Sequence, residues 1–147
     1  MSRPRLPYRT LAPKVFDALL ALEQQVQGLN LDAPLLELVK VRASQLNGCG
    51  FCLDMHSRDA LKVGVPQRQL LVLAAWREAG DLFTPRERAL LAFTEAVTLL
   101  SQAGVPDALL EELRAHFTDA EIVSWTLAVI TINAWNRMGV VAGLHPA

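Results

Sequence analysis

The chain contains only two cysteines, and it lacks the features that mark several classes of protein. Of its 147 residues, 14 are basic and 15 are acidic, which gives a formal net charge of −1. No segment forms the stripe of lysines and arginines that contacts phosphates, so we expect no nucleic-acid partner. There is also no Gly-rich phosphate-binding loop after a strand and no flavin or nicotinamide fingerprint. We therefore expect no bound cofactor.

Long apolar runs are also missing. The most apolar segment, Ile122 to Trp135, is shorter than the ~20 residues of an ordinary membrane span, so we expect a core or interface helix and no membrane partner. The N-terminus carries prolines and arginines where a secretory signal would be apolar, which predicts a cytoplasmic protein. Arg3, Arg5 and Arg9 are expected to lie in a flexible or interface-lying arm.

A period-two strand pattern does not persist anywhere, whereas helix signals recur along the chain. The sequence therefore predicts an all-α fold in a single domain, residues 1–147. Apolar residues make up 52% of the chain, and such an excess in a small domain often ends in a subunit interface. We expect a loop at Gly80 to Phe83, and helices at Pro13 to Gln27, Leu35 to Leu46, from Cys49 onward, Pro66 to about Trp76, Pro85 to about Gln102, Asp107 to Phe117, and from Thr118 onward.

The two cysteines lie close together and are followed by a histidine. On a helix that turns by about 100° per residue, Cys52 lies about 60° and His56 about 20° from Cys49, so the three side chains share one stripe. A cysteine reacts as its thiolate, which the positive end of a helix beginning after Gly48 favours. His56 could take up the proton. This pattern favours redox chemistry, in which one cysteine resolves an oxidised sulfur on the other.

Two other interpretations of the cysteines remain open. A structural zinc site needs four ligands, of which Cys49, Cys52 and His56 supply three. Cysteine is also among the residues most often buried, so the pair could be an inert part of the core. A Cys-x-x-Cys pair in the cytoplasm is nevertheless more often catalytic than structural.

Glu37 is a further candidate because of its distance from the turn at Asn47 and Gly48. If the two flanking helices fold back antiparallel, Glu37 and His56 both lie roughly 12–14 Å from the turn along their axes. Glu37 would then lie beside His56, where it could orient the ring and raise its basicity. The alternative is that Glu37 only stabilises the first turn of its own helix.

One segment runs from Glu37 to Cys52, includes the run from Arg42 to Gly48, and is followed by His56. These residues together resemble the AhpD-like alkylhydroperoxidase family of the carboxymuconolactone decarboxylase superfamily. The resemblance is strongest over residues 33–64, and the run Asn133 to Arg137 is similar to the closing helix of these proteins. It implies a helical bundle built around an antiparallel helical hairpin that carries Cys-x-x-Cys. It also implies a homo-oligomer, such as a trimer or hexamer.

The resemblance further implies thiol-dependent reduction of organic hydroperoxides. Cys52 resembles the thiol that attacks the peroxide, and Cys49 the resolving partner that exchanges with an external dithiol or lipoyl-type electron donor. Glu37 and His56 resemble a proton relay that acts through a water molecule. The chain departs from the best-known peroxidase of the family at Phe51, where that protein has a histidine, and so lacks one proposed member of the relay.

Two other functions are compatible with the sequence. Relatives in the superfamily decarboxylate a lactone acid without a thiol pair, and a redox sensor or thiol–disulfide exchange module would need little peroxidase turnover. The remaining candidates are expected to be structural. His116 is expected near a helix end and His145 at an exposed terminus, Arg42 is expected to pair with a carboxylate at an interface, and the tryptophans Trp76, Trp125 and Trp135 are expected to pack.

Overall fold

The computed structural model describes residues 3–147, so the first two residues of the predicted domain lie outside the described part. Over that range the chain forms helices and no strand, which confirms the all-α prediction. Two short 3-10 helices, Leu73–Glu78 and Gly80–Leu82, lie between α5 and α6. The α-helices are α1 (Tyr8–Leu11), α2 (Pro13–Gln27), α3 (Ala33–Asn47), α4 (Gly50–Lys62), α5 (Gln67–Val72), α6 (Pro85–Thr98), α7 (Leu100–Ala103), α8 (Asp107–Arg114) and α9 (Asp119–Ala142).

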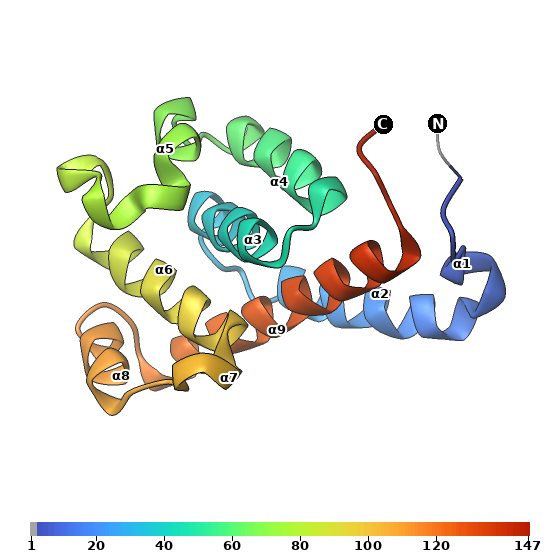
Figure 1. Cartoon of the computed structure of the whole chain (residues 1–147). Helices are drawn as coiled ribbons and strands as arrows, with labels where there is room; N and C mark the ends of the chain where they lie inside the picture. Colours follow the sequence, from blue (N-terminus) through green and yellow to red (C-terminus); the bar gives the residue numbers. More distant parts are fainter. Residues whose placement is uncertain (1–2) are drawn as a thin grey trace.

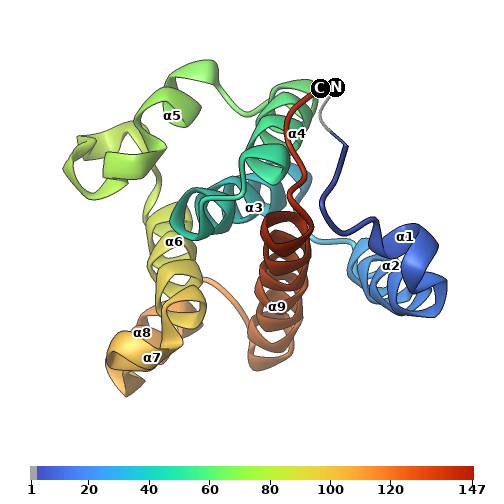
Figure 2. The same cartoon turned by 45° about the vertical axis from the view of Figure 1, so that its right-hand side comes forward.

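Helix α3 lies at the centre of the fold, packed against α4, α6 and α9 (Figures 1 and 2). Leu35 and Val39 belong to a core cluster shared with α6, α8 and α9. Leu38 and Val41 belong to a second cluster, shared with α4, α6 and the segment between α4 and α6. Because opposite sides of α3 are buried, its apolar residues do not form the single stripe of a surface helix.

The helix starts agree with the sequence signals. The Asp32 side chain accepts a hydrogen bond from the backbone N–H of Leu35 at the start of α3. Thr84 and Thr118 each form a capping box with the glutamate three residues later, at the starts of α6 and α9. These local bonds satisfy backbone donors that the first turn leaves free, so the sequence locates the helix starts well.

The segment after α4 differs from the prediction. The expected helix to Trp76 ends as an α-helix at Val72 and continues as a 3-10 helix with a kink at Ala75. The expected loop from Gly80 contains the second 3-10 helix. Arg88 of α6 donates hydrogen bonds to the backbone oxygens of Trp76 and Gly80, at 3.1 and 3.3 Å. These tertiary bonds hold the segment in a shape that local propensity does not encode.

Two later helices are shorter than predicted. The helix expected to reach Gln102 is interrupted at Leu99, next to buried Thr98, whose hydroxyl accepts a hydrogen bond from Asn133 of α9. The helix expected to reach Phe117 ends at Arg114, because the chain turns there to place Phe117 in the core, 5% exposed. In both places a contact with the rest of the fold outweighs the helical pattern.

The N-terminal arm is docked on the chain instead of being free. The Arg5 guanidinium donates to the backbone oxygens of Val140 and Val141, at 2.8 and 2.9 Å, where α9 runs toward its C-terminal end. The carbonyls at a helix end lack partners within the helix, so the arginine satisfies two of them. The arm therefore lies across the end of α9, and the short helix α1, which the sequence analysis did not predict, follows it (Figure 2).

Helix α9 contains the apolar segment that was expected to be a core or interface helix. Trp125, Val129 and Ile132 are buried, which confirms the core assignment. Val123 and Ile130 on the same helix are 69% and 48% exposed. Among residues 3–147, no helix combines the length and the apolar character that crossing a membrane requires.

Glu95 of α6 is the centre of a polar cluster that ties three segments together. Its carboxylate accepts hydrogen bonds from Arg42 Nε at 2.9 Å, from Trp76 Nε1 at 2.8 Å and from Arg77. The carboxylate that pairs with Arg42 therefore belongs to the same chain. Burial acts to raise the pKa of Glu95, but the hydrogen bonds from Arg77, Trp76 and Arg42 outweigh it and hold the pKa below its ordinary value of 4.5.

Replacing Glu95 with glutamine (Glu95→Gln) should lower the free energy of unfolding by about 2 kcal/mol at neutral pH, because Arg42 loses its charged partner. A depressed pKa stabilises the fold above the pKa of the unfolded chain, and this stabilisation is lost as the pH falls through the folded-state value. Urea unfolding between neutral and acidic pH should therefore show the difference from wild type shrinking on acidification.

The matched control for this measurement is Glu111→Gln, which removes an exposed carboxylate paired with Arg114. Exposed ion pairs contribute little to stability, so this variant should unfold almost as the wild type does. Equal losses in the two variants would contradict the role given to Glu95.

Candidate active site

The two cysteines lie at the turn between α3 and α4, which form the predicted antiparallel hairpin. Helix α3 ends at Asn47, and Gly48 follows in the left-handed conformation with φ of 64°, which glycine adopts without steric cost. Cys49 is then the N-cap of α4, and its Sγ accepts a hydrogen bond from the Cys52 backbone N–H at 3.3 Å. Sequence and structure agree closely here, because turn chemistry is local.

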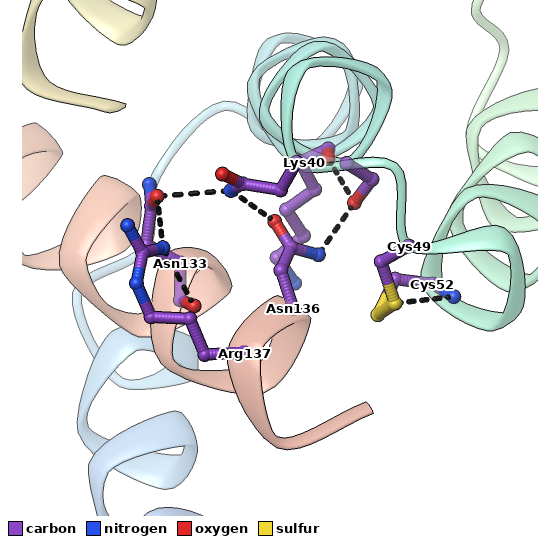
Figure 3. The surroundings of a disulfide bond; sticks show 8 residues. Lys40, Cys49, Cys52, Asn133, Asn136 and Arg137 are labelled. Atoms are coloured by element: carbon purple, nitrogen blue, oxygen red, sulfur yellow. Dashed lines mark hydrogen bonds between the residues drawn. A yellow bond between two sulfur atoms is a disulfide. The ribbon is translucent and has the colours of Figure 1, made fainter. Parts of the chain in front are cut away.

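Cys49 and Cys52 form a disulfide that is almost completely buried, at 2% and 3% exposure. The bond lies against α9 at Gly139 (Figure 3 shows its surroundings). A Cβ atom at Gly139 would lie 3.1 Å from the Sγ of Cys49 and 3.5 Å from that of Cys52. The missing side chain of Gly139 therefore makes the room that the disulfide occupies, a role that the sequence analysis did not find.

A network of amide side chains fixes the turn against α9 (Figure 3). The Asn47 amide donates to the Oδ1 atoms of Asn133 and Asn136, at 3.0 and 2.9 Å. The Asn136 amide in turn donates to Ser44 Oγ at 3.0 Å. Because Asn136 and Ser44 are fully buried, these hydrogen bonds give the turn one defined position on α9.

Glu37 lies beside His56, as the antiparallel hairpin requires. The His56 Nδ1 and Glu37 Oε2 atoms are 3.0 Å apart, and the two side chains are 10% and 12% exposed. A carboxylate only accepts hydrogen bonds, so Nδ1 carries the proton in this pair and Nε2 of a neutral ring is left as a base. The pair thus has the geometry of an oriented general base.

Lys40 connects Glu37 to a second carboxylate. Its Nζ atom lies 3.6 Å from Glu37 Oε1 and 3.2 Å from Glu23 Oε1 of α2. The other oxygen of Glu23 accepts a hydrogen bond from Trp135 Nε1 of α9 at 3.2 Å. No role was predicted for Lys40 or Glu23 from the sequence, and Trp135 was expected only to pack. Helices α2 and α9 are distant in sequence from the motif, and no local pattern shows that they meet there.

These groups line a cavity of about 760 Å³. Cys52 lines this cavity, whereas Cys49 does not line its described part. The N-terminal arm forms part of the wall, which makes the cavity dependent on a segment outside the motif. Its apolar and aromatic lining includes Leu6, Pro7, Tyr8, Phe16, Phe51, Met55, Trp135 and Leu144, and its polar lining includes Arg9, Glu23, Glu37, Lys40, His56 and Asp59.

Two cavity residues have shifted pKa values. Burial raises the pKa of Tyr8 above its usual value of 10.0, and the charge of Arg9 opposes this only in part. The hydrogen bond from Lys62 holds the pKa of Asp59 below 3.8, with smaller help from the charges of Lys62, His56 and Lys40 and despite some burial. Asp59 therefore stays a carboxylate at neutral pH.

The other candidates lie away from the cavity. His116 lies just beyond α8, and His145 is exposed and lines a separate small pocket with Arg3 and Arg5. Trp76 and Trp125 are buried in the two core clusters. Within residues 3–147 no cluster of three or more histidine, cysteine or acidic side chains is arranged to hold a metal ion.

Known proteins resemble the chain along nearly its whole length. It is 35% identical over 143 residues to the uncharacterized protein YdfG of Bacillus subtilis, with 97% of each chain covered. A crystal structure from Agrobacterium tumefaciens superposes with a TM-score of 0.94, at 41% identity and 99% coverage of both chains. That protein is of unknown function and is named as a candidate antioxidant defence protein, AhpD.

A second structure, an uncharacterized peroxidase-related protein from Ralstonia eutropha described as an alkylhydroperoxidase AhpD core, superposes with a TM-score of 0.82. It is 26% identical, and the match covers 95% of this chain and 74% of that one. The sequence profile of the carboxymuconolactone decarboxylase family matches residues 13–96, which include both cysteines, Glu37 and His56. The chain therefore belongs to the carboxymuconolactone decarboxylase family, as one of its AhpD-like members.

Proposed function

We propose that the protein is a thiol-dependent peroxidase that reduces organic hydroperoxides through a Cys49/Cys52 dithiol–disulfide cycle. The observation that carries the proposal is that Cys52, one half of a disulfide pair, shares a cavity with the Glu37–His56 pair. A nucleophilic sulfur and an oriented base at one opening are what peroxide reduction needs. The AhpD-like relatives support the same assignment.

The cycle starts from the reduced pair. His56, oriented by Glu37, takes the Cys52 proton, and the thiolate attacks one peroxide oxygen. The O–O bond breaks, the leaving oxygen takes a proton and departs as the alcohol, and Cys52 becomes a sulfenic acid. The Cys49 thiol then attacks that sulfur, which forms the disulfide and releases water. A dithiol donor supplies two electrons and two protons to reopen it.

Two parts of the site favour Cys52 as the attacking thiol. Cys52 faces the cavity with His56, whereas Cys49 is held behind it at the N-cap of α4. Cys49 is nevertheless bonded to Cys52, so the resolving step needs no large movement. Phe51 occupies the place of a relay histidine, so on this proposal Glu37 and His56 carry the proton transfer without that third group.

The external electron donor and the assembly are also parts of the proposal. We propose a dithiol or lipoyl-type donor, because a sulfur buried under the cavity wall is reached more easily by a small thiol than by a folded protein surface. We also propose a cytoplasmic homo-oligomer, a trimer or hexamer. Exposed apolar side chains on α1 and α9, such as Leu11 at 67% and Val123 at 69% exposure, support burial against another copy.

Cys52→Ser should abolish peroxide turnover, and Cys49→Ser should permit one oxidation of Cys52 and then stop, because the disulfide cannot form. Stopped-flow measurement of thiol oxidation by cumene hydroperoxide, followed by mass mapping of the sulfur products, tests both expectations. Equal turnover by wild type and Cys52→Ser would exclude this cycle. Disulfide formation without turnover would instead indicate a redox sensor or exchange module.

Gly139→Ala should make the disulfide easier to reduce, because the added methyl group crowds Cys49 Sγ while a reduced thiol can rotate away. An overpacking cost of about 1–2 kcal/mol corresponds to about 20–40 mV for this two-electron couple. Equilibration with a glutathione or dithiothreitol buffer measures the shift in potential.

The matched control is Gly50→Ala, also beside the cysteines. There a Cβ atom meets only Pro146, at an ordinary 3.8 Å. Its potential should stay near that of wild type. A potential for Gly139→Ala that is equal to wild type or more reducing would show that Gly139 does not set the space for the sulfurs.

A further inference from the structure

Among residues 3–147, Lys40 is the only buried lysine, and it has no role in the proposed cycle. It is 6% exposed and lies in the wall of the cavity. Taking an ammonium group out of water is unfavourable unless charged partners compensate it. Glu23 at 3.2 Å and Glu37 at 3.6 Å supply that compensation from two different helices. Lys40 is thus held between two carboxylates.

Hydrogen bonds and ion pairs connect five side chains in a continuous series from α9 to α4. Trp135 Nε1 donates to Glu23, Glu23 pairs with Lys40, Lys40 with Glu37, and Glu37 with His56. All five side chains line the cavity that Cys52 lines. The other charged or titratable side chains that line it are Tyr8 and Arg9 of α1 and Asp59 of α4.

Without a cation between them, Glu23 and Glu37 would be two like charges in a poorly solvated wall. Carboxylates that share such a site avoid the repulsion when one of them binds a proton. A protonated Glu37 is a weaker acceptor and can itself donate to Nδ1, so it would no longer hold the ring in the tautomer that leaves Nε2 as the base. The tautomer and the orientation of His56 therefore depend on Lys40, the cation that contacts Glu37.

We propose that Lys40 is a positioning residue for the Cys52 thiol. Anchored by Glu23, it holds Glu37 in the carboxylate form that orients His56 as the base for Cys52. The inference extends the proposed peroxidase function and rests on its assignment of His56 as that base. Lys40 itself touches no reacting atom in this scheme, so its effect is entirely on the protonation and orientation of its neighbours.

The test measures how readily Cys52 of the reduced full-length protein reacts with iodoacetamide as a function of pH, with alkylation of Cys52 quantified by peptide mass. Lys40→Met should slow alkylation near neutral pH about tenfold and move the midpoint of the profile upward by about one pH unit. Lys40→Arg keeps a cation between the carboxylates and should restore the rate to within about threefold of wild type.

The decisive variant is Lys40→Met combined with Glu23→Gln. It removes the second carboxylate along with the lysine, so Glu37 is again free to remain charged and the profile should return most of the way to wild type. It also removes a buried ion pair as a unit, which protects folding if Lys40→Met alone does not fold. Lys14→Met, the same change at an exposed site on α2, is the matched control and should leave the profile unchanged.

A Lys40→Met profile that coincides with wild type would overturn the proposal. So would a slow profile that persists in both Lys40→Arg and the double variant, because a charge-holding role predicts recovery in each. Circular dichroism and thermal melting of every variant identify losses that arise from unfolding.

Alkylation needs no peroxide, which separates the two proposals. If the wild type turns over no hydroperoxide but the profiles move as expected, the peroxidase function fails and the role of Lys40 stands. If peroxide turnover and alkylation by Lys40→Met both match wild type, the role of Lys40 fails and the peroxidase function stands.

Discussion

The whole arrangement depends on how the turn between α3 and α4 is held on α9. Hydrogen bonds from Asn47 to Asn133 and Asn136 fix the turn laterally, and the absent side chain of Gly139 sets how closely it approaches. Gly48 supplies the left-handed residue that makes the turn short. The position of the sulfurs is therefore set by a helix that begins some seventy residues after them. A change in α9 alters the site without touching the motif.

The second constraint is the burial of charge beside the cysteines. Glu23, Lys40 and Glu37 sum to one net negative charge, since two carboxylates face one ammonium group. In a poorly solvated cavity wall such charges interact more strongly than in water. Buried ion clusters are often no more stabilising than apolar residues of the same size, so stability alone gives little reason for this one.

The fold class, the hairpin and most helix starts could be predicted from the sequence because they depend on local chemistry. Pro34 near the start of α3 and Gly48 at its end mark that helix within a few residues, and the two capping boxes do the same for α6 and α9. Helix ends were less predictable. At Leu99 and after Arg114 the chain leaves the helix because of contacts with α9 and the core, which no nearby residue signals.

The candidate site likewise has contacts that the local sequence predicts and contacts that only the tertiary packing creates. The spacing of Glu37 and His56 from the turn located their contact, since an antiparallel hairpin leaves little choice of partner. Glu23 and Trp135 reach the same cavity from α2 and α9, and their contribution depends on packing between helices that are far apart in sequence. Lys40 was within the motif, but its role is visible only once both carboxylates are placed around it.

The range matched by the family profile separates the charged groups of the site from part of its apolar wall. Residues 13–96 contain every charged group in the chain of contacts from Glu23 to His56, together with both cysteines. Part of the apolar wall, including Leu6, Tyr8 and Trp135, lies outside that range. On the proposed function, the proton-transferring groups therefore lie within the residues that the family profile matches. A substitution at Leu6 or Tyr8 would therefore alter the apolar wall, and on the proposal the access of hydroperoxides to Cys52, without replacing any group assigned to thiol activation.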